Sequence, residues 1–165
     1  GFETIKRGKI SLNGQIVSNN VVTAPTEDRN LGMVLQERAL FPHLTVKKNI
    51  MFGIDKLPHK KSILADLARL FKITTILDKF PGEISGGEQQ RVAFARSLAP
   101  EPGLLMLDEP FSALNQDLKE ELYTELIRIF DERNVAVLLV THDVAEATKL
   151  TSSQAKLDCG VLANN

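Results

Sequence analysis

The feature that most constrains the fold is an uninterrupted apolar run, Leu104–Leu107, that ends directly in Asp108 and Glu109. Such a run predicts a buried strand of a parallel sheet that is covered on both faces. Consecutive side chains on a strand point to opposite faces, so the two acids are not expected to bind one ion together. One carboxylate could hold a hydrated metal ion while the other is aimed at a nucleophile. The alternative is that both acids cap a following helix.

A glycine-led helix start precedes this strand. Ser85 and Glu88 have the spacing of a capping box, and Gly86 and Gly87 lie within the same first turn. Glycine is a poor helix former, but without a Cβ atom it lets a phosphate approach the free amides of that turn. The alternative is an ordinary capped helix. Two arginines, Arg91 and Arg96, are expected to lie off the buried face of this helix, which comprises Val92, Ala95, Leu98 and Ala99.

Together these segments resemble the nucleotide-binding subunit of ABC transporters. Residues 85–91 are similar to the family signature, residues 104–109 to Walker B with its catalytic glutamate, and residues 112–115 to the D-loop. The order and spacing match over nearly the whole chain, so the composite is more specific than any one motif. The D-loop pattern usually has aspartate where this chain has Asn115, which keeps a helix cap but loses a charge.

The resemblance implies an α/β fold: a P-loop NTPase-like ABC ATPase core, with a mainly parallel sheet and flanking helices, plus an inserted helical subdomain. We expect residues 1–36 and 103–165 to form the core. Residues 40–100, approximately, would form the helical subdomain with the signature.

The resemblance also implies roles for individual residues, with ATP and Mg²⁺ as cofactors. Asp108 would hold Mg²⁺ through water, Glu109 would polarise the attacking water, and His142 would contact the γ-phosphate. Gln36 would touch the metal and sense that water. The nucleotide-binding residues of the signature, which would face the ATP of a second subunit in a head-to-tail dimer, are Ser85, Gly86, Gly87 and Glu88.

The printed sequence has no phosphate-binding P-loop. The pattern G-x-x-x-x-G-K-[ST] fails at Gly8-Lys9, because Glu3 replaces its first glycine and Ile10 its hydroxyl residue. We therefore interpret the chain as a nucleotide-binding domain without its N-terminal P-loop (Walker A) portion. We expect this chain alone to bind ATP weakly or not at all and to be inactive.

Residues 39–46 resemble the importer version of the segment that faces a membrane subunit. We expect an exposed apolar surface around Phe41, Pro42, His43 and Leu44. Within it His43 is an interface residue rather than a metal ligand, because no other ligands surround it. The other expected elements are a hairpin turning at Asn13-Gly14, strands at 31–35 and 135–140, helices at 60–73 and 74–79, and a capping box formed by Asp143 and Glu146.

Composition limits the partners. Twenty Lys and Arg residues against 21 Asp and Glu give a net charge of −1, so no global field attracts nucleic acid. No apolar run approaches the roughly 20 residues that span a bilayer, and direct membrane insertion is not expected. The expected partners are transmembrane permease subunits and a second nucleotide-binding subunit. We expect a cytoplasmic location, peripheral on the inner face of the plasma membrane.

The sequence thus predicts the ATP-binding ATPase subunit of a solute importer. One alternative is a non-catalytic, signature-bearing interaction module, which the missing P-loop supports. Another is a soluble ABC ATPase outside transport, against which stand the segment Leu40–His43 and the near-neutral charge. The transported solute stays open among metal ions, polyamines, sugars and oxyanions.

Overall fold

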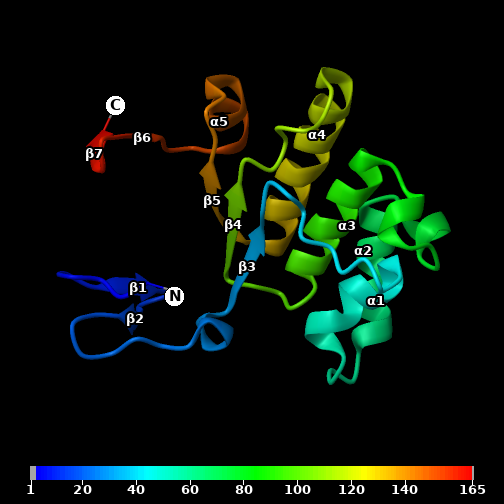
Figure 1. Cartoon of the computed structure of the whole chain (residues 1–165), viewed down its shortest axis with the longest axis horizontal. Helices are drawn as coiled ribbons and strands as arrows, with labels where there is room; N and C mark the ends of the chain where they lie inside the picture. Colours follow the sequence, from blue (N-terminus) through cyan, green and yellow to red (C-terminus); the bar gives the residue numbers. More distant parts are fainter. Residues whose placement is uncertain (1–2, 165) are drawn as a thin grey trace.

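The computed structural model describes residues 3–164 and contains a three-stranded parallel sheet with helices on one side (Figure 1). Its strands, in spatial order, are β3 (Leu31–Val34), β4 (Leu104–Asp108) and β5 (Ala136–Val140). The α-helices are α1 (Val46–Met51), α2 (Lys60–Leu70), α3 (Gly86–Leu98), α4 (Gln116–Arg133) and α5 (Val144–Leu150). Short 3-10 turns lie at Thr26–Arg29, Phe52–Ile54, Thr74–Ile76 and Pro81–Glu83. The α/β class predicted from the sequence is confirmed.

Two antiparallel hairpins stand apart from this sheet. The first, β1 (Ile10–Leu12) with β2 (Gln15–Ser18), turns at Asn13 (φ 49°) and Gly14 (φ 79°) as predicted. Positive φ at both turn residues matches the twist of two-residue hairpins. The second, β6 (Ala155–Asp158) with β7 (Val161–Asn164), was not predicted.

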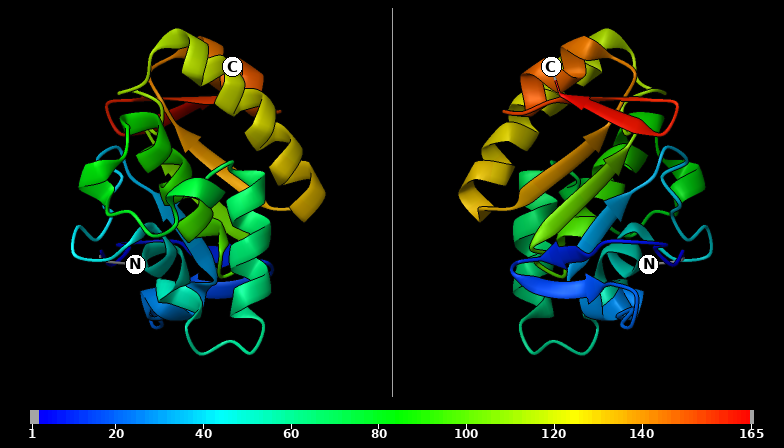
Figure 2. Two further views of the ribbon diagram at one scale, coloured as in Figure 1. Left: turned by 90° about the vertical axis from the view of Figure 1, so that its right-hand side faces the viewer. Right: turned by 90° about the vertical axis from the view of Figure 1, so that its left-hand side faces the viewer.

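Helices cover only one face of the parallel sheet, as the two views of Figure 2 show. On the helical face Val34, Leu105 and Leu107 are at most 1% exposed. On the other face the register aligns Met33, Met106 and Leu138, and Leu138 is 50% exposed. The expectation that these strands are buried on both faces is therefore wrong for the described residues. An apolar run shows that a strand can be covered, but it does not supply a second layer.

The helices follow the predicted patterns with three differences. The helix predicted at 74–79 is only a 3-10 turn over Thr74–Ile76. Helix α2 ends at Leu70 rather than at residue 73, and Lys72 just beyond it adopts a left-handed φ of 55°. The predicted buried face of α3 is confirmed, but Arg91 also lies inside, only 6% exposed. Its guanidinium pairs with Glu125 of α4 and lies 3.2 Å from Glu121. An amphipathic pattern assigns arginine to solvent because it cannot anticipate a buried counter-charge on another helix.

A single buried cluster joins the sheet to helices α1 to α4. Helix α3 lies directly against β3: the Ser97 hydroxyl donates to the carbonyl of Met33 at 2.7 Å. Gly32 permits this approach, since a Cβ there would lie 2.5 Å from the carbonyl oxygen of Ser97. The division into a core and a helical subdomain remains a prediction. Within the described residues, no helix has the length and hydropathy needed to cross a membrane.

Candidate functional site

The candidate site lies at the carboxyl edge of the parallel sheet, where α/β proteins commonly bind ligands. Gln36 lies two residues beyond β3, Asp108 is the last residue of β4, and His142 lies two residues beyond β5. The register pairs Asp108 with Val140, so β4 and β5 end side by side. Three segments that are far apart in the sequence therefore bring their polar residues to one edge.

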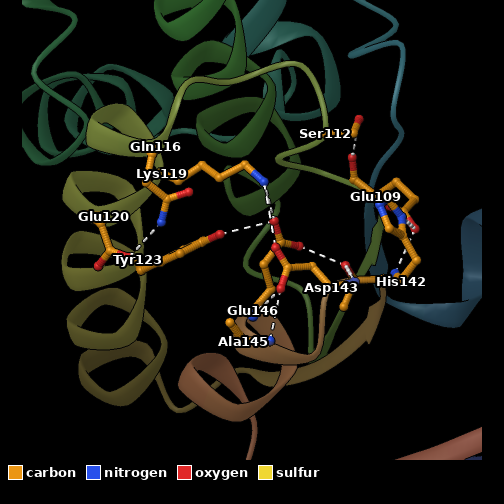
Figure 3. A network of polar contacts seen from close by, with 11 residues as sticks. Glu109, Ser112, Gln116, Lys119, Glu120, Tyr123, His142, Asp143, Ala145 and Glu146 are labelled. Atoms are coloured by element: carbon orange, nitrogen blue, oxygen red, sulfur yellow. Dashed lines mark hydrogen bonds and ion pairs between the residues drawn. The ribbon is translucent and has the colours of Figure 1, made fainter.

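Glu109 and His142 form a direct pair at this edge (Figure 3). The Glu109 carboxylate accepts a hydrogen bond from the His142 backbone N–H at 2.9 Å and lies 2.7 Å from Nδ1 of the ring. The bond to Glu109 and the charge of Glu109 raise the pKa of His142. Glu109 leaves the strand geometry with a left-handed φ of 47°, a strained conformation that functional sites often contain.

Asp108 lies on the open face of the sheet and is exposed. Among the described residues, neither its carboxylate nor the Gln36 side chain has a hydrogen-bonding or ionic partner. Both offer oxygen ligands, which Mg²⁺ prefers. The described residues contain no cluster of three His, Cys, Asp or Glu side chains that could enclose a metal. Mg²⁺ usually keeps several waters and binds one or two carboxylates plus phosphates, so Asp108 fits a hydrated Mg²⁺.

The predicted capping box at the start of α3 is confirmed. The Ser85 hydroxyl oxygen accepts from the Glu88 N–H at 3.3 Å, and the Glu88 carboxylate accepts from the Ser85 N–H and hydroxyl, both at 2.7 Å. These bonds hold the pKa of Glu88 below its ordinary value. Both side chains therefore already serve the helix cap. A role in nucleotide binding is not tested by this geometry and stays a prediction.

The two signature glycines have different surroundings. A Cβ at Gly87 would lie 2.3 Å from Cδ2 of Leu118 on α4, so close packing of two helices accounts for this glycine. A Cβ at Gly86 would meet only the Arg38 guanidinium, at 3.3 Å. Close packing therefore explains the glycine at position 87 but not the one at position 86.

Sequence reasoning missed Arg38, which links the segment after Gln36 to α3. Its Nε donates to Gln90 at 3.1 Å, and Nη1 lies 3.4 Å from the Gln89 side-chain oxygen. Arg96 of α3 donates in return to the Arg38 carbonyl at 3.1 Å. Arg38 and the next residue both adopt left-handed φ values, 59° and 45°. No sequence pattern signals this contact, because its partners lie about 50 positions away.

The strand edge and the start of α3 remain two separate groups. Among residues 3–164, no hydrogen bond or ion pair joins the turn 85–88 to Asp108, Glu109 or His142. Two hollows of about 260 and 340 Å³ lie elsewhere, beside Arg133, and neither contains a predicted site residue. One group can orient water and a metal, and the other presents a helix start. Neither is an enclosed pocket.

The expected docking segment is partly exposed. Pro42 and His43 are exposed, whereas Phe41 and Leu44 are half-buried, so none of the four lies in the core. The fully buried Asn49 fixes this loop: its Oδ1 accepts from the Phe41 N–H at 2.8 Å, and its Nδ2 donates to the carbonyls of Phe41 and Leu44 at 3.1 and 3.0 Å.

Two helix starts near the site behave differently. Asn115 caps α4 as predicted, accepting from the Leu118 N–H at 3.0 Å. Asp143 caps α5, but Glu146 does not complete the predicted capping box. Its carboxylate is instead bound by Lys119, Tyr123 and Thr141. That prediction was wrong because three donors beyond the local turn outcompete the N-cap amide.

Comparison with known proteins identifies the family. Residues 1–112 match the model of the ABC transporter family, so the chain belongs to that family. The fold predicted from the motifs is the P-loop NTPase fold of these ATPases.

The chain is similar to several import ATP-binding proteins. It is 43% identical over 164 residues to the Fe(3+) ions import ATP-binding protein of Pseudomonas fluorescens, an alignment that covers 98% of this chain and 46% of that protein. The sulfate/thiosulfate import ATP-binding protein of Synechococcus elongatus is 39% identical, with 97% of this chain and 46% of the relative covered. The molybdenum import ATP-binding protein of Methylococcus capsulatus is 38% identical, with 97% and 45% covered. The chain thus spans less than half the length of these curated relatives.

Proposed function

We propose that this chain is part of the ATP-binding subunit of an importer and that its strand edge is the hydrolytic half of an ATPase site. The observation that carries the proposal is the Glu109–His142 pair, with the unpartnered Asp108 carboxylate beside it in sequence. The similarity to import ATP-binding proteins supports the transport context.

The two acids have separate tasks. Asp108, with Gln36 as a second oxygen donor, would hold Mg²⁺, which supplies charge neutralisation at the phosphates when it is bound. Glu109 orients and polarises the attacking water, and His142 positions the γ-phosphate. In the structure the His142 ring and N–H hold the Glu109 carboxylate in a fixed direction. This pairing orders the base before substrate arrives.

The start of α3 supplies the other half of the site. The free backbone N–H groups of Gly86 and Gly87, next to Ser85, would bind the phosphates of ATP held by a second subunit arranged head to tail. The separation of this turn from the strand edge within one chain supports an arrangement in which each half serves a different ATP. Nucleotide binding in the whole protein requires a P-loop, which the printed residues do not contain.

The segment 39–46 is the proposed contact to transmembrane permease subunits. Its exposed Pro42 and the 62% exposed Phe52, whose ring centroid lies 4.6 Å from that of Phe41, offer apolar surface beside the exposed His43. Such a surface suits docking of a membrane subunit at the inner face of the plasma membrane. The relatives import different solutes, so the solute here stays open among the classes named above.

Paired substitutions test this function in a protein completed with a P-loop segment from a relative. Glu109→Gln should abolish steady-state ATP hydrolysis while preserving ATP-bound dimers, because it removes the base but leaves the phosphate contacts. Asp108→Asn should weaken Mg²⁺-dependent nucleotide binding and dimer formation. Turnover and dimer fraction are measured for both variants. Equal, mild defects in the two variants would contradict the separate catalytic roles proposed for the two acids.

A further inference from the structure

Glu146 is a buried carboxylate that the proposed mechanism does not use. It is 2% exposed. Three donors from two segments surround it: Lys119 and Tyr123 of α4, which Figure 3 shows, and Thr141 just after β5. One carboxylate oxygen accepts from Lys119 Nζ at 2.7 Å and from the Tyr123 hydroxyl at 3.0 Å; the other accepts from the Thr141 hydroxyl at 2.8 Å. A buried charge is tolerated only with such partners, so these three bonds hold the Glu146 carboxylate in one position.

The network ends directly beside His142. The Thr141 hydroxyl donates to Glu146 and accepts from the Asp143 N–H at 3.0 Å, which ties together the residues before and after the histidine. The His142 side chain itself is 81% exposed, and its one polar contact among the described residues is Glu109. Because little packing holds the ring, its direction depends on the backbone of residues 141–143.

The opposite side of the pair is fixed independently. The Glu109 N–H donates to the carbonyl of Val140 at 2.9 Å, which anchors the base to the end of β5. Whether the pair forms then depends on the position of the loop that leaves Val140 and carries His142. Thr141 is the first residue of that loop, and Glu146 is the group that holds its hydroxyl.

We propose that Glu146 is a positioning residue for the Glu109–His142 pair, acting through the Thr141 hydroxyl and tying the pair to α4 through Lys119 and Tyr123. The catalytic meaning of this role rests on the proposed function, but the positioning itself is a property of this chain. Glu146 touches no reacting group. Its effect is to keep His142 directed at Glu109.

The test is nitrogen and proton NMR of the three histidines in the 165-residue chain. Thr141→Val removes the link but keeps the Glu146 charge, which itself helps to raise the pKa of His142. In this variant the His142 pKa should fall most of the way back to its ordinary value. The nitrogen chemical shifts of its ring should no longer indicate the Nδ1–H tautomer that the bond to Glu109 favours. Thr141→Ser restores the hydroxyl and should restore both readouts. Glu109→Gln removes the charged partner of His142, so it gives the pKa and tautomer expected when the pair is completely lost.

His43 and His59 provide internal references, because a general loss of structure would move their signals as well. Unchanged His142 pKa and tautomer in a folded Thr141→Val chain would overturn the proposal. Should that chain fail to fold, Tyr123→Phe decides: releasing one Glu146 contact should lower the His142 pKa in part, and no change would count against the role. The measurement needs no ATP, so it can fail or succeed independently of the ATPase proposal.

Discussion

Glu109 combines a strained backbone with a paired side chain. Its left-handed φ of 47° turns the chain sharply after β4, while its carbonyl accepts from the Ser112 N–H and hydroxyl at 3.3 and 3.1 Å. A non-glycine residue in this conformation persists only where its surroundings over-determine it. The bonds to Ser112 on one side and His142 on the other supply that constraint.

The ionic pair makes the stability of the chain depend on pH. Because Glu109 raises the pKa of His142 in the folded state, the imidazolium form is favoured by folding. This contribution is complete below the pKa of an unfolded histidine and is lost as the pH rises through the raised folded value. The free energy of unfolding should therefore be higher for wild type than for Glu109→Gln. This difference should be largest in mildly acidic solution and should shrink with rising pH. Urea unfolding across that range measures it.

His142→Gln is the companion variant, because it removes the other partner of the same pair. It should lack the same pH-dependent excess of stability. An excess of wild type over Glu109→Gln that grows with pH would contradict the assigned pairing.

The residues of the strand edge could be predicted because parallel strands bring their carboxyl ends together whatever lies between them. Glu109 and His142 are 33 positions apart, and each follows an apolar run, which places both at this edge. Their roles, however, were assigned from the resemblance to the family and not from the apolar runs. Arg38 and Asn49 could not be assigned in this way. Their roles depend on which backbone carbonyls and amides fold next to them, and no local pattern records that.

At the scale of elements, the contact between α3 and α4 depends on one glycine. A Cβ at Gly87 would lie 2.3 Å from Leu118 Cδ2, inside van der Waals contact. Gly87→Ala gains helix propensity of up to about 1 kcal/mol, but it forces Leu118 to rotate into neighbouring side chains. We expect a net loss of about 1 kcal/mol in the free energy of unfolding.

A double-mutant cycle with Leu118→Ala isolates this clash, since shortening Leu118 removes the atom that the new methyl group meets. Leu118→Ala should cost less in the Gly87→Ala background than alone, with a coupling of at least about 0.5 kcal/mol. Gly82→Ala is the control, because nothing lies within 4 Å of a Cβ there. Strictly additive costs would show that the two positions do not meet.

Helix starts were predictable because caps are local. Ser85 and Asn115 act within three residues of their own helices, and both are confirmed. The exposure of β5 was not predictable, since its apolar residues specify a strand but not how many layers cover it. The Glu146 prediction failed for the same reason: a local capping pattern cannot weigh Lys119 and Tyr123, which lie 27 and 23 positions away.

At the scale of the whole molecule, the proposed function assigns this chain only part of a phosphate site. The strand edge offers Asp108 to a metal, but phosphates bind mainly to P-loop amides and a lysine, which the printed residues lack. We expect calorimetry of the 165-residue chain with MgATP to show no binding at micromolar concentration. Supplying a P-loop segment should restore it. Micromolar binding by the monomeric chain alone would refute this expectation.

The open face of the sheet has a further consequence for the isolated chain. Met33, Leu138 and Val140 are 39%, 50% and 55% exposed, and parallel sheets rarely leave apolar side chains in water. An exposed patch of this kind binds apolar dyes and promotes association. We expect the wild-type chain to bind such a dye and to self-associate as its concentration rises, as measured by fluorescence and sedimentation.

Leu138→Thr should reduce both dye binding and association, because it removes apolar surface from the open face while keeping a residue that favours strands. Its cost in the free energy of unfolding should stay within about 0.5 kcal/mol, as for other exposed positions. Leu139→Thr is the matched control: the adjacent side chain packs against the core on the helical face. It should destabilise the fold clearly and leave the open face unchanged. Equal effects of the two substitutions on stability, or undiminished association in Leu138→Thr, would show that association has another source.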